Sequence, residues 1–365
     1  MGSLRGVGYD RSMSFRTWVA LPAFAGILTA QQVSKQASGW TVDASGQRVE
    51  GPLYTSVESP TGSQKVETAR SINGRMVPIQ AEEDRVLRND AQGKVVERMI
   101  RKYDANGNPG PPTKVRIEET KGSDGSTTIR STSYESDING NMQLFEQSTT
   151  QIRKGATTET STTVERATLN GSLQAVERSA SVERPTGSGA QVESTVYRKD
   201  TNGNFTPFVQ EVKQISKSGN EETTDAARYV MGSDGKMTLS SRTVDRVKTN
   251  PDGSQVAETD VYSKFTAGRA GDTNANEPRL QEQIRKQRTP ADGGKVVETT
   301  TSRARLPNDP SRFGAYEQVS QVTYVSTDAA GREVKKTETA VGRRDTNGQI
   351  VTQEGRSESS VGAKK

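Results

Sequence analysis

The sequence predicts an all-β protein: a long antiparallel meander of about 20 strands, made of roughly nine hairpin repeats of ~32 residues. Three observations lead to this prediction. Glycine-centred turns recur at regular spacing, the segments between them are rich in strand-forming residues, and only 30% of the residues are hydrophobic. Even with its 34 glycines added, the chain stays below the ~45–50% apolar content of globular domains. We therefore expect a thin or spiralling sheet with a minimal core.

The first segment, residues 1–30, is expected to be a leader that contains a signal peptide. Its natural start is predicted at Met13, because Arg16 then supplies the positive charge that precedes an apolar run. Cleavage is predicted after Ala30, so that the mature chain begins near Gln31. A single N-terminal membrane anchor is the alternative, but the apolar run is shorter than the ~20 residues of a spanning helix and contains a proline.

The glycine turns divide the rest of the chain. Regular β-hairpin repeats are expected over 31–265, irregular repeats with longer loops over 266–315, and terminal hairpins with a polar tail over 316–365. Between Gly155 and Gly235 the turn glycines are spaced by 16 residues five times in succession. With about four residues in each turn, the strands would have roughly 12 residues and a length of ~40 Å.

The turns fall into two alternating classes. One has Asp-Xaa-Asn-Gly or a close relative, which suits tight hairpins because Asn and Gly tolerate positive φ. The other has Thr-Gly or Asp-Gly followed by a Val-Glu pair. The first class contains Gly74, Gly107, Gly140, Gly171, Gly203 and Gly348, and the second contains Gly62, Gly93, Gly187 and Gly293.

The strand segments offer few wholly apolar faces. In residues 113–118 only Val115 and Ile117 share an apolar face, and Thr, Arg, Lys and Glu fill both faces elsewhere. Cross-strand Thr–Thr and Arg–Glu pairs, at ~0.2–1 kcal/mol each, are expected to supply much of the lateral stability. An open sheet of this length is marginal, so it should curl, stack or pack against further copies.

One turn resembles a known repeat family. The segment RKYDANGN (101–108) is similar to the Tyr-Asp-Xaa-Xaa-Gly core of YD or Rhs-type hairpin repeats, and YRKDTNGN (197–204) resembles it more loosely. The resemblance implies hairpins that wind into a β-spiral shell. It covers the turns only, because the tyrosine-rich strands and the C-terminal cleavage core of that family are missing.

The composition argues against an enzyme. Histidine and cysteine are both absent, which removes the usual general base, disulfides, and thiolate or imidazole metal ligands. The carboxylates are spread at repeat spacing beside basic residues and Thr, as on an exposed sheet face. We expect no catalytic residues and no cofactor.

The Asp-Xaa-Asn-Gly tips have two interpretations. Calcium could use their oxygens, but the later bidentate Glu of an EF-type loop is not at the required position. Aspartate at the first turn position also caps backbone N–H groups without any metal, and we prefer that interpretation. The candidate calcium residues are Asp104, Asn106, Asp137, Asn139, Asp200, Asn202, Asp345 and Asn347.

The charge pattern does not indicate nucleic acid. The net charge is +5 from 50 basic and 45 acidic residues, and the two signs are interspersed without a long like-charged block. After the leader, no segment is apolar enough to span a membrane, so no membrane span is expected in the mature chain.

These features predict a secreted bacterial structural protein, extracellular or at the cell surface, whose partner is itself. An open meander exposes unpaired backbone groups at both edges, where a second copy could add a strand. Such edge contacts would build a filament, fibre or surface layer. The assembly contacts are predicted in the two terminal strands, at Gln31, Val33, Trp40, Ile350 and Val351.

Two alternatives stay open. One is a monomeric surface adhesin or carbohydrate-binding β-repeat module that uses the long loops of 266–315, with polysaccharide or the cell surface as its partner. The other is a largely disordered secreted polypeptide, which the low mean hydropathy of −0.81 permits but the evenly spaced turns oppose.

Overall fold

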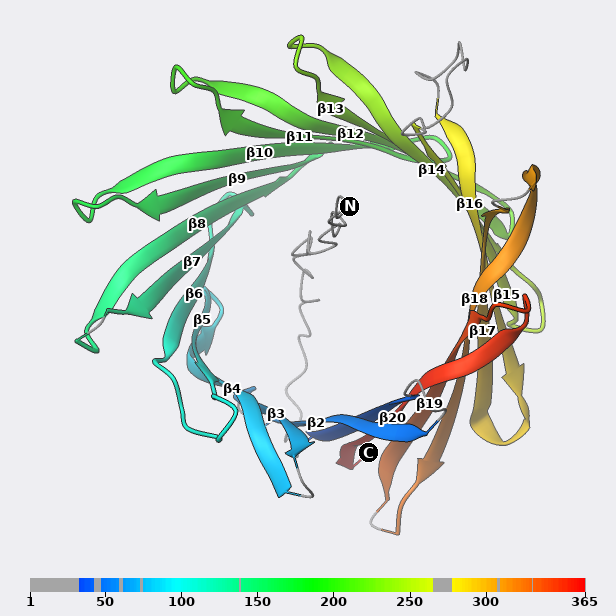
Figure 1. Cartoon of the computed structure of the whole chain (residues 1–365). Coiled ribbons are helices and arrows are strands. Elements are labelled where there is room, and N and C mark those ends of the chain that lie inside the picture. Colours follow the sequence, from blue (N-terminus) through cyan, green and yellow to red (C-terminus); the bar gives the residue numbers. More distant parts are fainter. Residues whose placement is uncertain are drawn as a thin grey trace, which may run out of the picture.

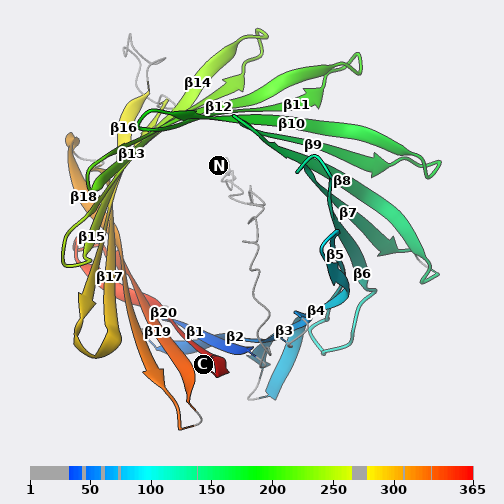
Figure 2. The same cartoon turned by 180° about the vertical axis from the view of Figure 1, so that it is seen from behind.

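The chain forms a closed barrel of 20 antiparallel strands, seen end-on in a computed structural model (Figure 1) and from behind in Figure 2. The structure describes residues 33–42, 47–58, 62–72, 75–137, 139–264, 278–306, 309–329 and 331–364. The strands are β1 Val33–Val42, β2 Arg48–Glu58, β3 Gln64–Ile72, β4 Arg75–Asp90, β5 Gly93–Lys102, β6 Thr113–Lys121, β7 Thr127–Ser136, β8 Met142–Lys154, β9 Thr158–Ala167, β10 Leu173–Thr186, β11 Gly189–Lys199, β12 Phe205–Ser218, β13 Glu221–Met231, β14 Met237–Thr249, β15 Gln255–Ser263, β16 Arg279–Ala291, β17 Lys295–Leu306, β18 Asp309–Thr327, β19 Arg332–Arg344 and β20 Ile350–Lys364.

Pairing between the first and last strands closes the barrel. Every strand pairs antiparallel with its neighbour along the chain, as in a meander. In addition, β1 pairs antiparallel with β20 from Ser34 opposite Val361 to Thr41 opposite Glu354. The all-β antiparallel prediction is therefore confirmed, and the prediction of an open, thin or spiralling sheet is wrong. The YD-type resemblance misleads in the same way, because the strands close into one ring.

The two predicted turn classes lie at opposite ends of the barrel. We call the end where odd strands turn into even strands rim A, and the end where even strands turn into odd strands rim B. The described Asp-Xaa-Asn-Gly-type glycines lie on rim A: Gly107, Gly140, Gly171, Gly203 and Gly348. The glycines followed by Val-Glu lie on rim B: Gly62, Gly93, Gly187 and Gly293. The two turn classes therefore alternate in the sequence because successive strands run in opposite directions.

A β-bulge follows the rim A turn in strand after strand. In β12, Phe208 is an extra residue, because Val209 pairs with Val196 while Pro207 pairs with the adjacent Tyr197. Each of five such residues stands five positions after a turn glycine: Phe145, Val176, Phe208, Ser240 and Gln353. Bulges bend a strand and increase its local twist. A bulge repeated once per hairpin therefore gives the sheet the curvature that closure requires.

The wall is a single layer with a very small core. Four hydrophobic side chains are buried among the described residues: Ala37, Val77, Val95 and Val244. Threonine hydroxyls meet across strands, at 2.9 Å for Thr150 and Thr162. Arginine–carboxylate pairs do the same, as between Arg98 and Asp84, where Nε lies 2.6 Å from Oδ1. The predicted polar cross-strand pairs and minimal core are both present, and their share of the lateral stability stays a prediction.

Closure overturns the predicted self-assembly. The filament prediction depended on two free sheet edges, one at each terminal strand. Those two strands pair with each other within one chain, so the described barrel offers no free edge to a second copy. The structural filament and the homo-polymer partner are therefore wrong interpretations of this fold, and the fold gives no support to the monomeric adhesin.

The predicted absence of a membrane span is also wrong for this architecture. It took account of apolar segments only, whereas a closed barrel satisfies its backbone groups between strands and is the one β-structure that can cross a bilayer. The 13 residues of β8 rise about 34 Å at a tilt near 40°, against a hydrocarbon core of ~30 Å.

Candidate functional site

The interior of the barrel is the candidate functional site. At ~4.8 Å between strands and a tilt of about 40°, 20 strands give a diameter of about 40 Å. Wall side chains fill about 5 Å on each side, half the ~10 Å separation of packed sheets. They leave a width of about 30 Å that the wall's own side chains do not reach. Figures 1 and 2 show this ring of strands from its two ends.

Both faces of the wall are hydrophilic. The neighbouring residues Glu97 and Arg98 of β5 point to opposite faces, because successive side chains alternate in a strand. Each makes an ion pair: Arg98 with Asp84 at 2.6 Å, and Glu97 with Lys114 at 2.5 Å. Along β4, β5 and β6 the interior is therefore lined by charged side chains whichever face it takes. Such a lining suits water and dissolved solutes.

Rim A carries a belt of aromatic side chains, which we call the tyrosine belt. Four tyrosines occupy the same register, next to the bulge, and each is paired with an aliphatic residue of the following strand. The pairs are Tyr134 with Leu144, Tyr197 with Pro207, Tyr229 with Leu239, and Tyr262 with Leu280. Aromatic girdles of this kind mark the level of the lipid headgroups in membrane barrels.

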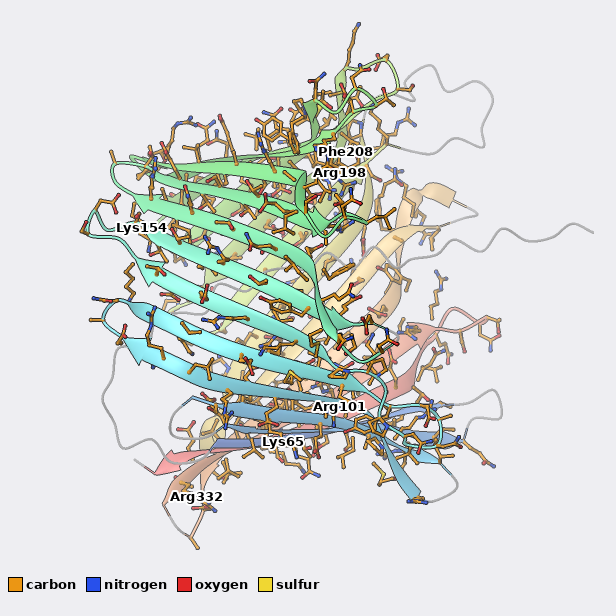
Figure 3. All side chains as sticks on the ribbon, turned by 90° about the vertical axis from the view of Figure 1, so that its left-hand side faces the viewer. Lys65, Arg101, Lys154, Arg198, Phe208 and Arg332 are labelled. Atoms are coloured by element: carbon orange, nitrogen blue, oxygen red, sulfur yellow. The ribbon has the colours of Figure 1, made fainter. Side chains whose placement is uncertain are left out.

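Exposed apolar side chains gather at the same end. The rim A set is Val49, Met76, Met142, Phe145, Leu169, Phe208, Tyr316 and Val351, whereas Leu87, Tyr324 and Val325 lie towards rim B. Basic groups stack on several rim A rings. The Arg198 guanidinium lies 4.2 Å from the Phe208 ring centre, and that of Arg48 lies 4.7 Å from Trp40. Figure 3 shows Arg198 and Phe208 towards one end of the strands and Lys154 towards the other.

The candidate calcium residues lie in the rim A turns, where their aspartates cap backbone N–H groups. One Asp104 carboxylate oxygen accepts the backbone N–H groups of Asn106 and Asn108, both at 2.8 Å. The carboxylates of Asp137, Asp200 and Asp345 each accept two backbone N–H groups in the same pattern. These bonds hold the pKa of Asp104 and Asp137 below the usual aspartate range; the largest cause is the Asn108 side chain for Asp104 and the Asn141 backbone N–H for Asp137. The calcium hypothesis stays a prediction.

The predicted assembly residues lie in or beside the two strands that close the barrel. Gln31 lies outside the described residues, and Val33 begins β1. Trp40 of β1 is opposite Gly355 of β20 and Glu50 of β2. Ile350 and Val351 begin β20 and pair with Arg344 and Arg343 of β19. The sequence located the two terminal strands, and the structure joins them within one chain.

The described ranges contain no cluster of three or more Asp and Glu residues arranged to hold a metal ion. Among those same residues no helix is long and apolar enough to cross a membrane.

Comparisons with solved structures give matches of low similarity. The structure is similar to Pseudomonas aeruginosa OccK5 (OpdH), with 11% identity, a TM-score of 0.44, and coverage of 92% of this chain and 98% of that one. A bacterial polysaccharide outer membrane secretin follows with 9% identity and a TM-score of 0.32, covering 92% and 100%. A porin-like protein from Bacteroides uniformis has 10% identity and a TM-score of 0.20, covering 77% and 95%.

No family model matches the sequence, and no curated protein matches it significantly. All three TM-scores are below 0.5, so the barrel rests on the chain's own strand pairing.

The sequence did not lead us to predict the tyrosine belt, although the spacing of the tyrosines from the turns could have indicated it. Tyr134, Tyr197 and Tyr229 each stand three residues before the first residue of a rim A turn, at Asp137, Asp200 and Gly232. A constant distance from successive turns of one class places side chains at one height of a meander.

Proposed function

We propose that this chain is a non-enzymatic channel of the bacterial cell surface that lets hydrophilic solutes pass through the barrel interior. The observation that carries the proposal is closure, by β1 and β20, of a 20-stranded ring with charged pairs on both wall faces. Barrels of 16–18 strands already leave an aqueous channel. Closed up-and-down barrels of this size occur in the outer membrane. This favours a cell-surface location over release as a soluble filament protein.

Rim A is the end best fitted to lipid. Charged pairs occupy both faces between the rims, and charge is costly on a lipid-facing wall. The tyrosine belt and the exposed apolar side chains of rim A supply the contrasting surface, with aromatic rings beside basic groups. We propose that the barrel enters the membrane from this end.

Conductance across planar lipid bilayers tests the channel. The full chain should produce stable open currents that scale with salt concentration, and polymers wider than about 30 Å should not block them from within. The control is the chain without residues 350–364, which lacks β20 and therefore the antiparallel β1–β20 pairing that closes the barrel. Absence of currents from the full chain, or equal currents from the shortened control, would refute the proposal.

A further inference from the structure

A cleft with three arginines opens on rim A, between β17, β18 and β19. Its volume is about 630 Å³, and its lining includes Arg305, Arg312, Tyr316, Arg344 and Asp345. Small-molecule sites in proteins have volumes of about 300–1,000 Å³. The cleft therefore has room for a small ligand or for the head of a larger one.

Two glycines make room for the guanidinium of Arg344. A Cβ atom at Gly314 would lie 2.9 Å from Arg344 Nη1, and one at Gly348 would lie 3.1 Å from Nη2. Both separations are too short for a relaxed contact, so a side chain at either position would push the guanidinium away. The backbone of the β19–β20 turn and of β18 thus leaves room for the Arg344 guanidinium in the cleft.

The second arginine of the cleft, Arg305, contacts two residues outside the lining of the cleft. Arg305 Nε donates a 2.6 Å hydrogen bond to the carbonyl oxygen of Leu280 on β16. Its guanidinium also lies 5.3 Å from the centre of the Phe313 ring, within the range of a cation–π contact. Arg312, on the same strand as Phe313, is exposed at the mouth. The three guanidinium groups come from three successive strands.

Among the described residues that line the cleft, Asp345 is the one carboxylate. Its Oδ1 atom accepts the backbone N–H groups of Asn347 at 2.9 Å and Gln349 at 2.8 Å, so this oxygen is engaged in the turn. In the described part of the chain, no ion pair joins Arg344 or Arg312 to a carboxylate. The neighbouring Arg343, by contrast, pairs with both Glu317 and Glu354. In the described lining, Arg312 and Arg344 together carry one more charge than Asp345.

We infer that this cleft binds a phosphate group. Arginine forks match phosphate oxygens bidentately, and placed guanidinium groups with excess positive charge favour a multiply charged oxyanion over chloride. The phosphate can belong to a soluble phosphate ester or to a lipid headgroup, since the cleft opens on the rim that carries the tyrosine belt.

The test is calorimetric titration of the full chain in detergent with inorganic phosphate, against chloride at equal ionic strength. The wild-type chain should bind phosphate in preference to chloride. The double variant Arg312→Gln/Arg344→Gln should bind it about tenfold more weakly or worse, because charge-assisted bonds are lost. The matched control is Arg153→Gln, which removes an exposed charge near rim B and should stay within about twofold.

Equal phosphate affinities in all three proteins would overturn the inference, as would a wild-type chain without preference for phosphate. Arg344→Lys keeps the charge but not the guanidinium fork, so it should retain only part of the phosphate affinity. Because this change is conservative, it also tests whether the weaker binding of the double variant comes from misfolding. Vesicles of phosphatidylcholine with and without phosphatidic acid then separate the two sources. A loss of vesicle binding specific to the double variant indicates a headgroup, and unchanged vesicle binding indicates a soluble ester. Both experiments measure binding and not conductance, so their outcome is independent of whether the chain forms a channel.

Discussion

Individual aspartates and glycines set the geometry of the turns, because the wall has almost no core to impose it. Asp137 illustrates this on rim A, where its carboxylate accepts the N–H groups of Asn139 and Asn141 at 2.8 and 2.9 Å. The sequence predicted this capping role from residue type and position. It could not predict which turns share a rim until strand direction was known.

The Asp137 cap makes its turn sensitive to acid. Since hydrogen bonds lower the pKa of Asp137 in the folded chain, the cap stabilises the turn above the unfolded aspartate pKa of ~3.9. That contribution is lost as the pH falls through the lower folded value. The amide resonances of Asn139 and Asn141 should report a titration midpoint below ~3.9. A midpoint at or above that value would show that the carboxylate does not hold these amides.

Gly93 should be indispensable at rim B. Its φ is +150°, and a Cβ there would lie 1.9 Å from the carbonyl oxygen of Glu119 on β6. Gly93→Ala should therefore destabilise the barrel by about 2 kcal/mol or more in denaturant unfolding. Gly187→Ala is the matched control, because no heavy atom lies within 4 Å of its added Cβ; it should change stability by less than about 0.5 kcal/mol. Similar losses in both variants would contradict this account.

Strands and turns were largely predictable, but the bulges were not. Turn chemistry and β-branched composition located the hairpins, and the sequence also showed that two classes of turn alternate along the chain. A bulge leaves no comparable mark: Phe208 and Ser240 fill the same structural position with unrelated side chains. Register is fixed by pairing with the neighbouring strand, so the bend that closes the sheet appears only with the paired structure.

The apolar side chains of rim A should drive membrane binding. Phe145→Ser/Phe208→Ser removes two exposed rings of the rim A set and should weaken co-sedimentation with lipid vesicles about tenfold or more, from the loss of buried apolar area. Tyr324→Ser, at an exposed ring near rim B, should leave binding unchanged. If the double variant and Tyr324→Ser weakened vesicle binding equally, the lipid contact would not be specific to rim A. If neither variant weakened vesicle binding, the rim A side chains would not contact lipid.

At the scale of the whole molecule, closure separates the predicted filament from the observed barrel. Composition indicated a one-layer sheet with polar faces, and the structure has that wall. The sequence located both terminal strands but could not show their mutual pairing. Partners such as Thr41 and Glu354 lie far apart in the chain, and their meeting depends on the accumulated twist and bend of every hairpin. Closure removes the two free edges that the filament needed, and it is the observation on which the proposed channel rests.

A crosslink between the terminal strands tests closure most directly. Ser38 of β1 is directly opposite Ser357 of β20. Their separation suits a disulfide, since antiparallel partners lie ~4.5–5.5 Å apart between Cα atoms. The chain has no cysteine, so Ser38→Cys/Ser357→Cys introduces the only two thiols. After oxidation, denaturation and non-reducing electrophoresis, the account predicts one compact monomer band that shifts on reduction. A ladder of disulfide-linked multimers, with little internally crosslinked monomer, would contradict it.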